Sequence, residues 1–368
     1  MTLDRRDILI GGAAAALATA LPRTAGAQSA FAPRPGAWRR FEITTRLEPA
    51  KAGGGAMQAW IPLPAVNAQD WSQSNGSTWR TNGRGVVKQD PKYGSQMLHV
   101  EFAADEKAPF VEVTSNIATR DRAVDFAKPG TPAPLTSAER KLYLSGTELI
   151  PVDGIVKQTA DKIVAGARTD VEKARAIYEW VVENTFRNAS TRGCGIGDIA
   201  AMLKSGNLGG KCADLNALYV GLARAAGLPA RDVYGVRVAP SQFGYKSLGA
   251  GSQNITKAQH CRAEVYLAAF GWVPVDPADV RKVILEEPPT KLAIGDPKVV
   301  AARKALFGSW EGNWLAYNVA HDVALPGSSG PKLAFLMYPQ AESASLRLDC
   351  LDPDTFKYTI HARDVSAA

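Results

Sequence analysis

A cysteine at the start of a helical pattern is the residue of this chain best placed for covalent chemistry. The stretch Gly209-Gly210-Lys211-Cys212-Ala213-Asp214 precedes apolar residues that recur at helical spacing. A helix N-terminus lowers the pKa of a thiol through its macrodipole and free amide groups, and those groups could also bind a developing oxyanion. Cys212 is therefore a candidate nucleophile. The alternative is that it serves only in packing, as most free cysteines do.

A histidine and an aspartate further along the chain could serve this thiol. His260 begins a strand pattern, 260–267, whose alternate residues are apolar, so we expect Cys261 to face the core and His260 to face a cleft. Asp276 stands at the end of the next strand pattern, 272–276. An imidazole can take the thiol proton and return it to a leaving group, and a carboxylate can fix the imidazole tautomer. Together the three residues predict nucleophilic acyl transfer.

Helices and strands must alternate to position these residues. Thr169-Asp170-Val171-Glu172 has the pattern of a capping box, which predicts a helix from about residue 170. Further helices are expected over 198–204 and 212–226, the second ended by Gly227. Period-two alternation follows and predicts strands over 236–238, 259–267 and 272–276, and the tail adds a helix over 298–306 and strands over 314–323, 332–337 and 358–363.

The chain divides into regions of different pattern. Strand-like alternation predicts an antiparallel β domain over 38–125, followed by a Pro-rich linker over 126–145. The candidate catalytic residues fall in a core over 146–295, and a β-rich extension over 296–368 is expected to pack on that core. Within the core, the segment 240–259 is rich in Gly, Ser and Gln, and its length is typical of a functional loop.

The order of these motifs resembles the transglutaminase-like superfamily of cysteine enzymes. The resemblance implies an α+β fold with a papain-like core, in which a helical subdomain carrying the nucleophile helix packs on an antiparallel sheet, preceded by a small β-sandwich-like domain. It implies Cys212 as nucleophile, His260 as base and Asp276 as the residue that orients the base. The matching stretches are Ile177-Tyr178-Glu179-Trp180-Val181, 209–231 and 260–276.

The same resemblance implies the reaction. An amide is attacked, a thioester forms, and water or an amine resolves it. We expect an exported thiol enzyme that hydrolyses amide or isopeptide bonds, a peptidase or amidase. Two alternatives stay open: a protein-glutamine transamidase that cross-links its substrates, and a non-enzymatic binding or scaffold protein that keeps an idle triad.

Two positions depart from the family pattern. Arg262 stands where the family often has a tryptophan, and no side-chain oxyanion donor is obvious upstream of Cys212. Asn207 is the candidate for that donor, and Lys211 and Trp272 are candidates for contact with the substrate or oxyanion.

The other cysteines have plainer interpretations. Cys194 lies in a Gly-rich loop, 192–197, that lacks the features of a phosphate loop. Cys261 is expected to serve in packing, with a redox partnership with Cys194 as the alternative, and the sequence names no disulfide pair among these residues and Cys350. Asp214 is expected to complement the helix dipole. No Cys or His pair has zinc-ligand spacing, so no metal and no cofactor are expected.

The first 27 residues resemble a twin-arginine export signal. Arg5-Arg6 precede a mild apolar run, 8–21, that is shorter than the roughly 20 residues of a membrane-spanning helix. Ala25-Gly26-Ala27 fits a cleavage site, so the mature chain is expected to begin at Gln28, with a tether over 28–37, and to be periplasmic or secreted. No later stretch is apolar enough to predict stable membrane insertion.

Composition places the chain among globular proteins and limits its partners. Of the 368 residues, 46% are hydrophobic and 21% are charged, which excludes wholesale disorder. A net charge of +7 would suit an anionic partner, but the basic residues occur at most in pairs and without interleaved aromatic residues, which argues against nucleic acid. The expected partner is a peptide, protein or cell-wall peptide substrate.

Overall fold

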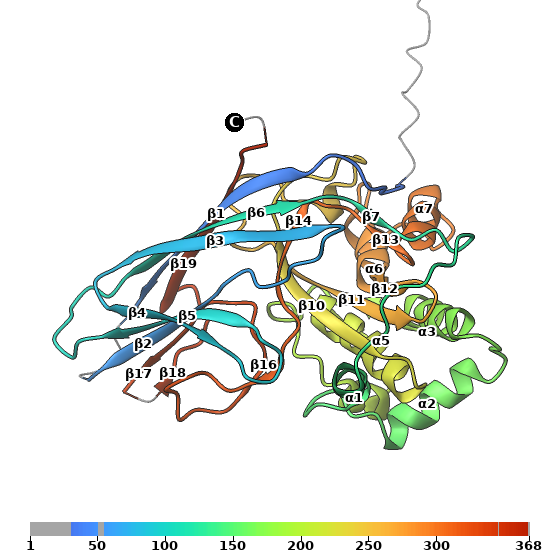
Figure 1. Ribbon diagram of the computed structural model, residues 1–368, viewed down its shortest axis with the longest axis horizontal. Helices are drawn as coiled ribbons and strands as arrows, with labels where there is room; N and C mark the ends of the chain where they lie inside the picture. Colours follow the sequence, from blue (N-terminus) through green and yellow to red (C-terminus); the bar gives the residue numbers. More distant parts are fainter. Residues whose placement is uncertain (1–30, 51–54, 345, 367–368) are drawn as a thin grey trace, which may run out of the picture.

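Two β-sheets packed face to face and a helical core built on a third sheet make up the protein (Figure 1). The computed structural model describes residues 31–50, 55–344 and 346–366. The predicted α+β architecture is confirmed, with strands and helices in separate layers rather than alternating along one parallel sheet.

The sandwich joins two antiparallel sheets, of order β19-β1-β6-β3 and β18-β17-β2-β5-β4. Their strands are β1 (Arg39–Pro49), β2 (Met57–Pro62), β3 (Ser72–Thr81), β4 (Arg84–Gln89), β5 (Gln96–Phe102), β6 (Val111–Thr119), β17 (Gln340–Ser343), β18 (Leu346–Arg347) and β19 (Phe356–Asp364). Apolar side chains from both sheets meet in one buried cluster that includes Leu47, Ile61, Val100, Val113 and Phe356.

The last strands of the chain complete the sandwich that the first strands begin. β19 pairs with β1 along its length, from Phe41 opposite Asp364 to Pro49 opposite Phe356, and β17 pairs with β2. The region 296–368 therefore does more than pack on the core as a separate extension. Its strands supply hydrogen-bond partners to β1 and β2, which would otherwise be open edges of their sheets.

The core sheet has the order β12-β11-β10-β14, and all its neighbours are antiparallel. Its strands are β10 (Ala230–Arg237), β11 (Gln259–Leu267), β12 (Gly271–Val275) and β14 (Trp314–Asn318). Helix α5 (Cys212–Ala225) packs against β11 and β10 and is buried at every position. The helices α2 (Gly154–Val164), α3 (Asp170–Asn184), α4 (Ile199–Ser205) and α6 (Pro277–Glu286) surround α5.

Local signals set the ends of the predicted helices. Thr169 caps α3 in the expected capping box, because its hydroxyl accepts from the Glu172 amide at 3.2 Å and the Glu172 carboxylate accepts from the Thr169 amide at 3.0 Å. Helix α5 begins at Cys212, as expected, and Gly227 follows its end at φ 85°, the left-handed conformation that glycine adopts without strain.

Two connecting regions are more ordered than the sequence analysis expected. The linker 126–145 ends in helix α1 (Ser137–Leu144), which Thr136 starts through a second capping box. Within the predicted tether, Phe31 is buried edge-on against Phe243 and Tyr245, with 5.2 and 5.1 Å between the ring centres. The remaining elements are β7 (Arg122–Ala123), β8 (Phe186–Arg187), β9 (Gly209–Gly210), η1 (Lys246–Leu248), α7 (Pro297–Ala305), β13 (Ser309–Trp310), β15 (His321–Val323) and β16 (Leu333–Phe335).

The expected export signal, 1–27, lies outside the described residues. Among the residues that are described, no helix combines the length and apolar character needed to cross a membrane.

Candidate active site

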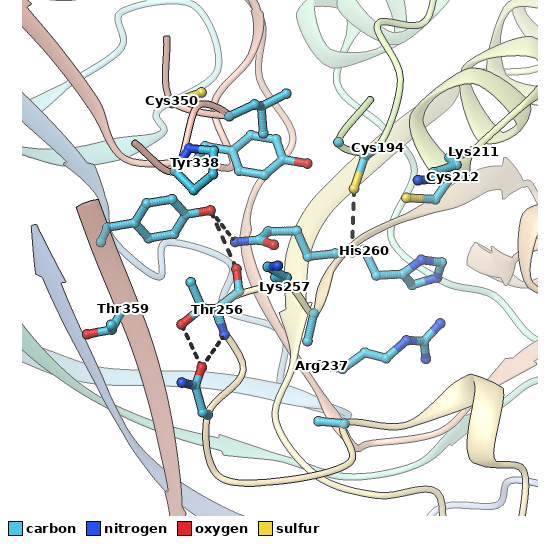
Figure 2. A pocket seen from close by; sticks show the side chains of 18 of the residues that line it. Cys194, Lys211, Cys212, Arg237, Thr256, Lys257, His260, Tyr338, Cys350 and Thr359 are labelled. Atoms are coloured by element: carbon cyan, nitrogen blue, oxygen red, sulfur yellow. Dashed lines mark hydrogen bonds between the residues drawn. The ribbon is translucent and has the colours of Figure 1, made fainter. Parts of the chain in front are cut away.

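Cys212 lies at the first position of α5, on the wall of a cavity of about 980 Å³. The thiol-bearing residue is 4% exposed. Across the cavity stand residues of β19, so the core and the sandwich both contribute walls. Figure 2 shows Cys194, Cys212 and His260 on one side and Thr359 of β19 on the other. The C-terminal strand is thus part of the site that contains the candidate nucleophile.

His260 is the second residue of β11 (Gln259–Leu267) and lines the same cavity, although it is only 3% exposed. Its Nε2 donates to Oδ2 of Asp276 at 2.7 Å. Because Nε2 carries that hydrogen bond, Nδ1 is the ring nitrogen left to exchange a proton with the Cys212 thiol. The neighbouring Cys261 is fully buried with its thiol against the sulfur of Met337 at 3.9 Å, which is the alternation that the sequence predicted.

Asp276 is fixed by the element that follows it. It is the N-cap of α6, and its Oδ1 accepts from the Asp279 amide at 3.0 Å while the side-chain amide of Asn216 lies 3.3 Å away. The residue has no exposed surface. One carboxylate oxygen therefore serves the helix and the other serves His260, so that the orientation of the imidazole depends on the start of α6.

A second carboxylate beside His260 escaped the sequence analysis. Oδ2 of Asp279 lies 3.3 Å from Nε2 of His260, and the carboxylate accepts two hydrogen bonds from Arg237 at 2.6 and 2.8 Å. Two signals could have revealed this pair. Asp279 stands one helical turn after Asp276, and Arg237 interrupts an apolar strand, which is unusual unless the charge has a buried partner.

The charges around the triad favour an ionised sulfur beside a protonated imidazole. The neighbouring thiols of Cys194 and Cys261, together with nearby His260, hold the pKa of Cys212 well below its ordinary value, although burial opposes them. Burial and the Arg237 charge act to lower the pKa of His260, but Asp279 and Asp276 outweigh them and raise it to about 9. Between these two pKa values the site holds a thiolate–imidazolium pair.

Arg262, which stands where the family often has a tryptophan, packs against tryptophans from another part of the chain. Its guanidinium lies over the rings of Trp310 and Trp314, 5.1 and 4.7 Å from their centres, and donates to the backbone oxygen of Glu311 at 2.9 Å. Its Nε is 3.7 Å from Asp276. The aromatic surface absent from position 262 is therefore present behind the triad, supplied by residues after the core.

Three thiols meet at the head of α5. The sulfur atoms of Cys194, Cys212 and Cys261 all lie within 4.8 Å of one another, and all three cysteines are free. Asp214 holds the loop that carries Cys194, because its Oδ1 accepts from the amides of Ile196 and Gly197, both at 3.0 Å. This fixed position supports a structural role for Asp214.

Among the described residues, two clusters have donor atoms that could bind a metal. The three thiols are ligands of the kind that soft cations prefer. The second cluster consists of His260, Asp276 and Asp279, but its carboxylates already accept hydrogen bonds from the protein. The hydrogen bonds within the protein therefore explain the second cluster without a metal.

The other predicted site residues fall in different places. Lys211 lines the cavity beside Cys212. Asn207 does not: it is exposed, and its side-chain oxygen accepts from the Gly209 amide at 3.2 Å, so the structure does not bring it to the sulfur. Trp272 lies on β12 beneath the guanidinium of Arg231, 4.0 Å from the ring centre, and lines a separate cavity. Neither residue is placed to contact a substrate at Cys212.

Comparison with known proteins agrees with this geometry. The family model of the transglutaminase-like superfamily matches residues 157–277, the span that contains α5, β11 and β12. The chain belongs to the transglutaminase-like superfamily. The recognition made from the sequence motifs is therefore confirmed, and with it the transglutaminase-like core of the fold.

Two relatives show how far the likeness extends beyond the transglutaminase-like core. A Haemophilus influenzae protein described as uncharacterized is 38% identical over 335 residues, which cover 86% of this chain and 89% of that protein. A crystal structure of a protein from Cytophaga hutchinsonii, proposed to be a cysteine protease, superposes with a TM-score of 0.50 at 14% identity, covering 89% of this chain and 99% of the other. At 14% identity, this likeness shows a shared fold and nothing beyond it.

Proposed function

We propose that this protein is a thiol enzyme that cleaves amide or isopeptide bonds by acyl transfer to Cys212. The observation that carries the proposal is the 2.7 Å hydrogen bond between His260 and Asp276 in a cavity that Cys212 also lines. Such a constellation activates a thiol without a cofactor, since the base and its orienting carboxylate are supplied by the chain itself.

The reaction would proceed in two halves. The Cys212 thiolate attacks the carbonyl carbon of the scissile amide, and the protonated His260 gives its proton to the departing amine. The amide nitrogen of Cys212 has no carbonyl partner within its own helix because it opens α5, and we propose that it binds the oxyanion. In the second half His260 takes a proton from water and the hydroxide attacks the thioester carbonyl. The carbon–sulfur bond then breaks, which returns the Cys212 thiolate beside the protonated His260 and releases the free acid.

Hydrolysis is the outcome we favour over transamidation. The name given to the Cytophaga hutchinsonii protein points in the same direction. Mixing the enzyme with a glutamine-containing peptide and a fluorescent primary amine separates the two, because incorporation of the amine into the peptide at rates above hydrolysis would identify a transamidase.

The nucleophile is tested by the rate of alkylation. At about pH 6 an ordinary thiol with a pKa of about 8.5 is less than about 1% ionised. We expect iodoacetamide to modify Cys212 at least about tenfold faster than Cys350, a half-buried thiol on the same cavity, as measured by peptide mapping. The variant His260→Ala should reduce the preference, because one of the groups that lower the pKa of Cys212 is lost, and Cys212→Ala should abolish turnover while Cys350→Ser retains it.

The acyl intermediate gives a second test. Rapid acid quenching followed by intact-mass measurement should show the wild-type enzyme with an added acyl group on Cys212. Equal reactivity of Cys212 and Cys350, together with no retained acyl group, would leave the idle-triad scaffold as the better account.

We also propose that the enzyme acts outside the cytoplasm on a peptide, protein or cell-wall peptide. The support is the paired arginines and the small-residue motif of the first 27 residues. Replacing Arg5 and Arg6 by lysine should retain the protein in the cytoplasm, and N-terminal sequencing of the exported form should begin at Gln28.

A further inference from the structure

The cavity that holds Cys212 is strongly basic. Among the described residues that line it, seven are lysine or arginine and a single one, Glu48, is acidic. A low-dielectric wall concentrates the field of such charges in the space they enclose, so the cavity attracts anions more strongly than the net charge of the chain would indicate.

Carboxylates of the protein neutralise part of this charge. Arg46 contacts Glu48 at 2.5 Å, and Arg237 is paired with Asp279 at 2.6 Å. Two other lining cations are less balanced, because Arg187 and Lys282 share one carboxylate, that of Glu286, which lies 3.8 Å from the Lys282 amine. The wall below the triad therefore keeps a surplus of positive charge.

Three lysines have no acidic partner. In the described part of the chain, no carboxylate lies within ion-pair distance of Lys211, Lys257 or Lys357, and all three line the cavity. Lys257 and Lys357 are exposed at its mouth, whereas Lys211 stands next to the nucleophile. Figure 2 shows Lys211 beside Cys212 and Lys257 between the triad and β19. Lysines without an acidic partner therefore lie at intervals between the Cys212 sulfur and the β19 wall.

The opposite wall offers a backbone edge as well. At Ile360 the edge of β19 is covered, because its amide donates to the Thr256 hydroxyl at 2.9 Å and its carbonyl accepts from the Ile255 amide at 2.8 Å. Backbone groups two residues apart on a strand point the same way, so the amide and carbonyl of Tyr358 face the cavity. An extended peptide could bind there as an added strand.

We propose that the cavity binds an acidic peptide in extended form along β19 at Tyr358, with its carboxylates on Lys211, Lys257 and Lys357, and that this peptide is the acyl donor for Cys212. The inference rests on the proposed function, since it names the substrate class of that site. The open strand edge favours a peptide over other polyanions, which lack the amide groups that a strand edge pairs with.

Matched reactive peptides test the charge preference. One probe carries two glutamates, its twin carries two glutamines at the same positions, and both end in a vinyl sulfone that alkylates thiols. At low ionic strength we expect the acidic probe to label Cys212 at least about fivefold faster, and about 0.5 M salt to bring the ratio near one. The ratio cancels any change in the intrinsic reactivity of the thiol.

Variants assign the effect to the lysines. Lys257→Met combined with Lys357→Met should lower the ratio of the two rates at least about threefold. The matched control is Lys88→Met combined with Lys107→Met, two exposed lysines outside the cavity, and it should leave the ratio unchanged. A scan of backbone N-methyl groups along the acidic probe should find a position at which labelling falls about tenfold, because a strand hydrogen bond is lost.

The outcomes separate this inference from the proposed function. If both probes label Cys212 rapidly and at equal rates, the acidic-peptide inference is overturned and the thiol enzyme stands. If an oligonucleotide protects Cys212 from iodoacetamide better than polyglutamate does, the donor is not a peptide. If neither probe nor iodoacetamide prefers Cys212 over Cys350, the proposed function itself fails.

Discussion

Asp276 links chemistry to folding through its two carboxylate oxygens. One oxygen holds His260 and the other caps α6 at the Asp279 amide. Asparagine caps a helix about as well as aspartate does, but it carries no charge to stabilise an imidazolium. The two duties of this side chain can therefore be separated by a single substitution.

The variant Asp276→Asn should lose turnover far more than stability. We expect kcat to fall by about 10²–10⁴, because the imidazolium is less stabilised and its tautomer is no longer fixed. The midpoint of thermal unfolding should change little compared with Arg237→Met, which removes the guanidinium that pairs with the buried Asp279 carboxylate, at a cost of about 3–5 kcal/mol. A large loss of stability in Asp276→Asn without loss of turnover would contradict this assignment.

The pH profile should report the thiolate–imidazolium pair. The pKa of His260 is raised to about 9, so the proton that it gives to the leaving amine is present below that pH and lost above it. We expect kcat/KM to fall on the alkaline side with an apparent pKa of about 9, while its acidic limb, set by Cys212, lies well below the ordinary thiol range. Activity that keeps rising through pH 10 would rule out His260 as the acid.

Cys194 should tune the reactivity of the nucleophile through its thiol. Its thiol is the leading cause of the lowered pKa of Cys212. The variant Cys194→Ala removes that neighbouring thiol, so the pKa of Cys212 should rise and the pH dependence of its alkylation by iodoacetamide should move to higher pH. The control Cys350→Ala, which leaves the thiol cluster intact, should keep the wild-type profile.

At the scale of elements, close packing of β14 against β10 depends on a glycine. A Cβ built at Gly235 would lie 2.0 Å from the backbone oxygen of Leu315 and 2.5 Å from the ring of Trp314. β14 continues the sheet that carries His260, whose backbone pairs with Gly235 on the other side. The missing side chain therefore lets the tail of the chain join the core sheet.

The variant Gly235→Ala should separate these strands. We expect a loss of at least about 1–3 kcal/mol in the free energy of unfolding, measured with urea, because neither the backbone nor the buried tryptophan has room to move. Gly166→Ala is the matched control, since a Cβ at that position meets nothing within 4 Å. Equal stability of the two variants would show that β14 is held loosely.

The elements that the sequence predicted well are those with strong local patterns. The capping box at Thr169, the helix from Cys212 and the strand from His260 are visible in periodicity and end signals, so the nucleophile and its base could be found. The pairing of β19 with β1 joins the two ends of the chain, and no local sequence pattern predicts it. The position of Asn207 depends on the conformation of the turn before β9, which local patterns do not predict either. Asp279 and Arg237 were missed because they pair across the fold: Arg237 lies on β10 and Asp279 on α6, which are far apart in the sequence.

At the scale of the whole molecule, the last strands of the tail, β17 to β19, are part of the first domain. Phe356 on β19 is buried among residues of β1, β2, β5 and β6. The variant Phe356→Ala should lower the free energy of unfolding by about 3–5 kcal/mol, as measured by urea denaturation. The exposed Val300→Ala on α7 should change it by less than about 0.5 kcal/mol. A small effect at Phe356 would mean that the sandwich does not depend on its last strand.

The neighbouring positions of β1 and β19 have a consequence for how the chain matures. The first strand leaves the ribosome long before its partner exists, and the wall facing the sulfur is made from that late partner. A nascent chain can thus build its helices early, yet it has no enclosed reaction chamber until synthesis is almost finished. Any reaction at Cys212 that depends on this wall can therefore begin only after β19 has been made.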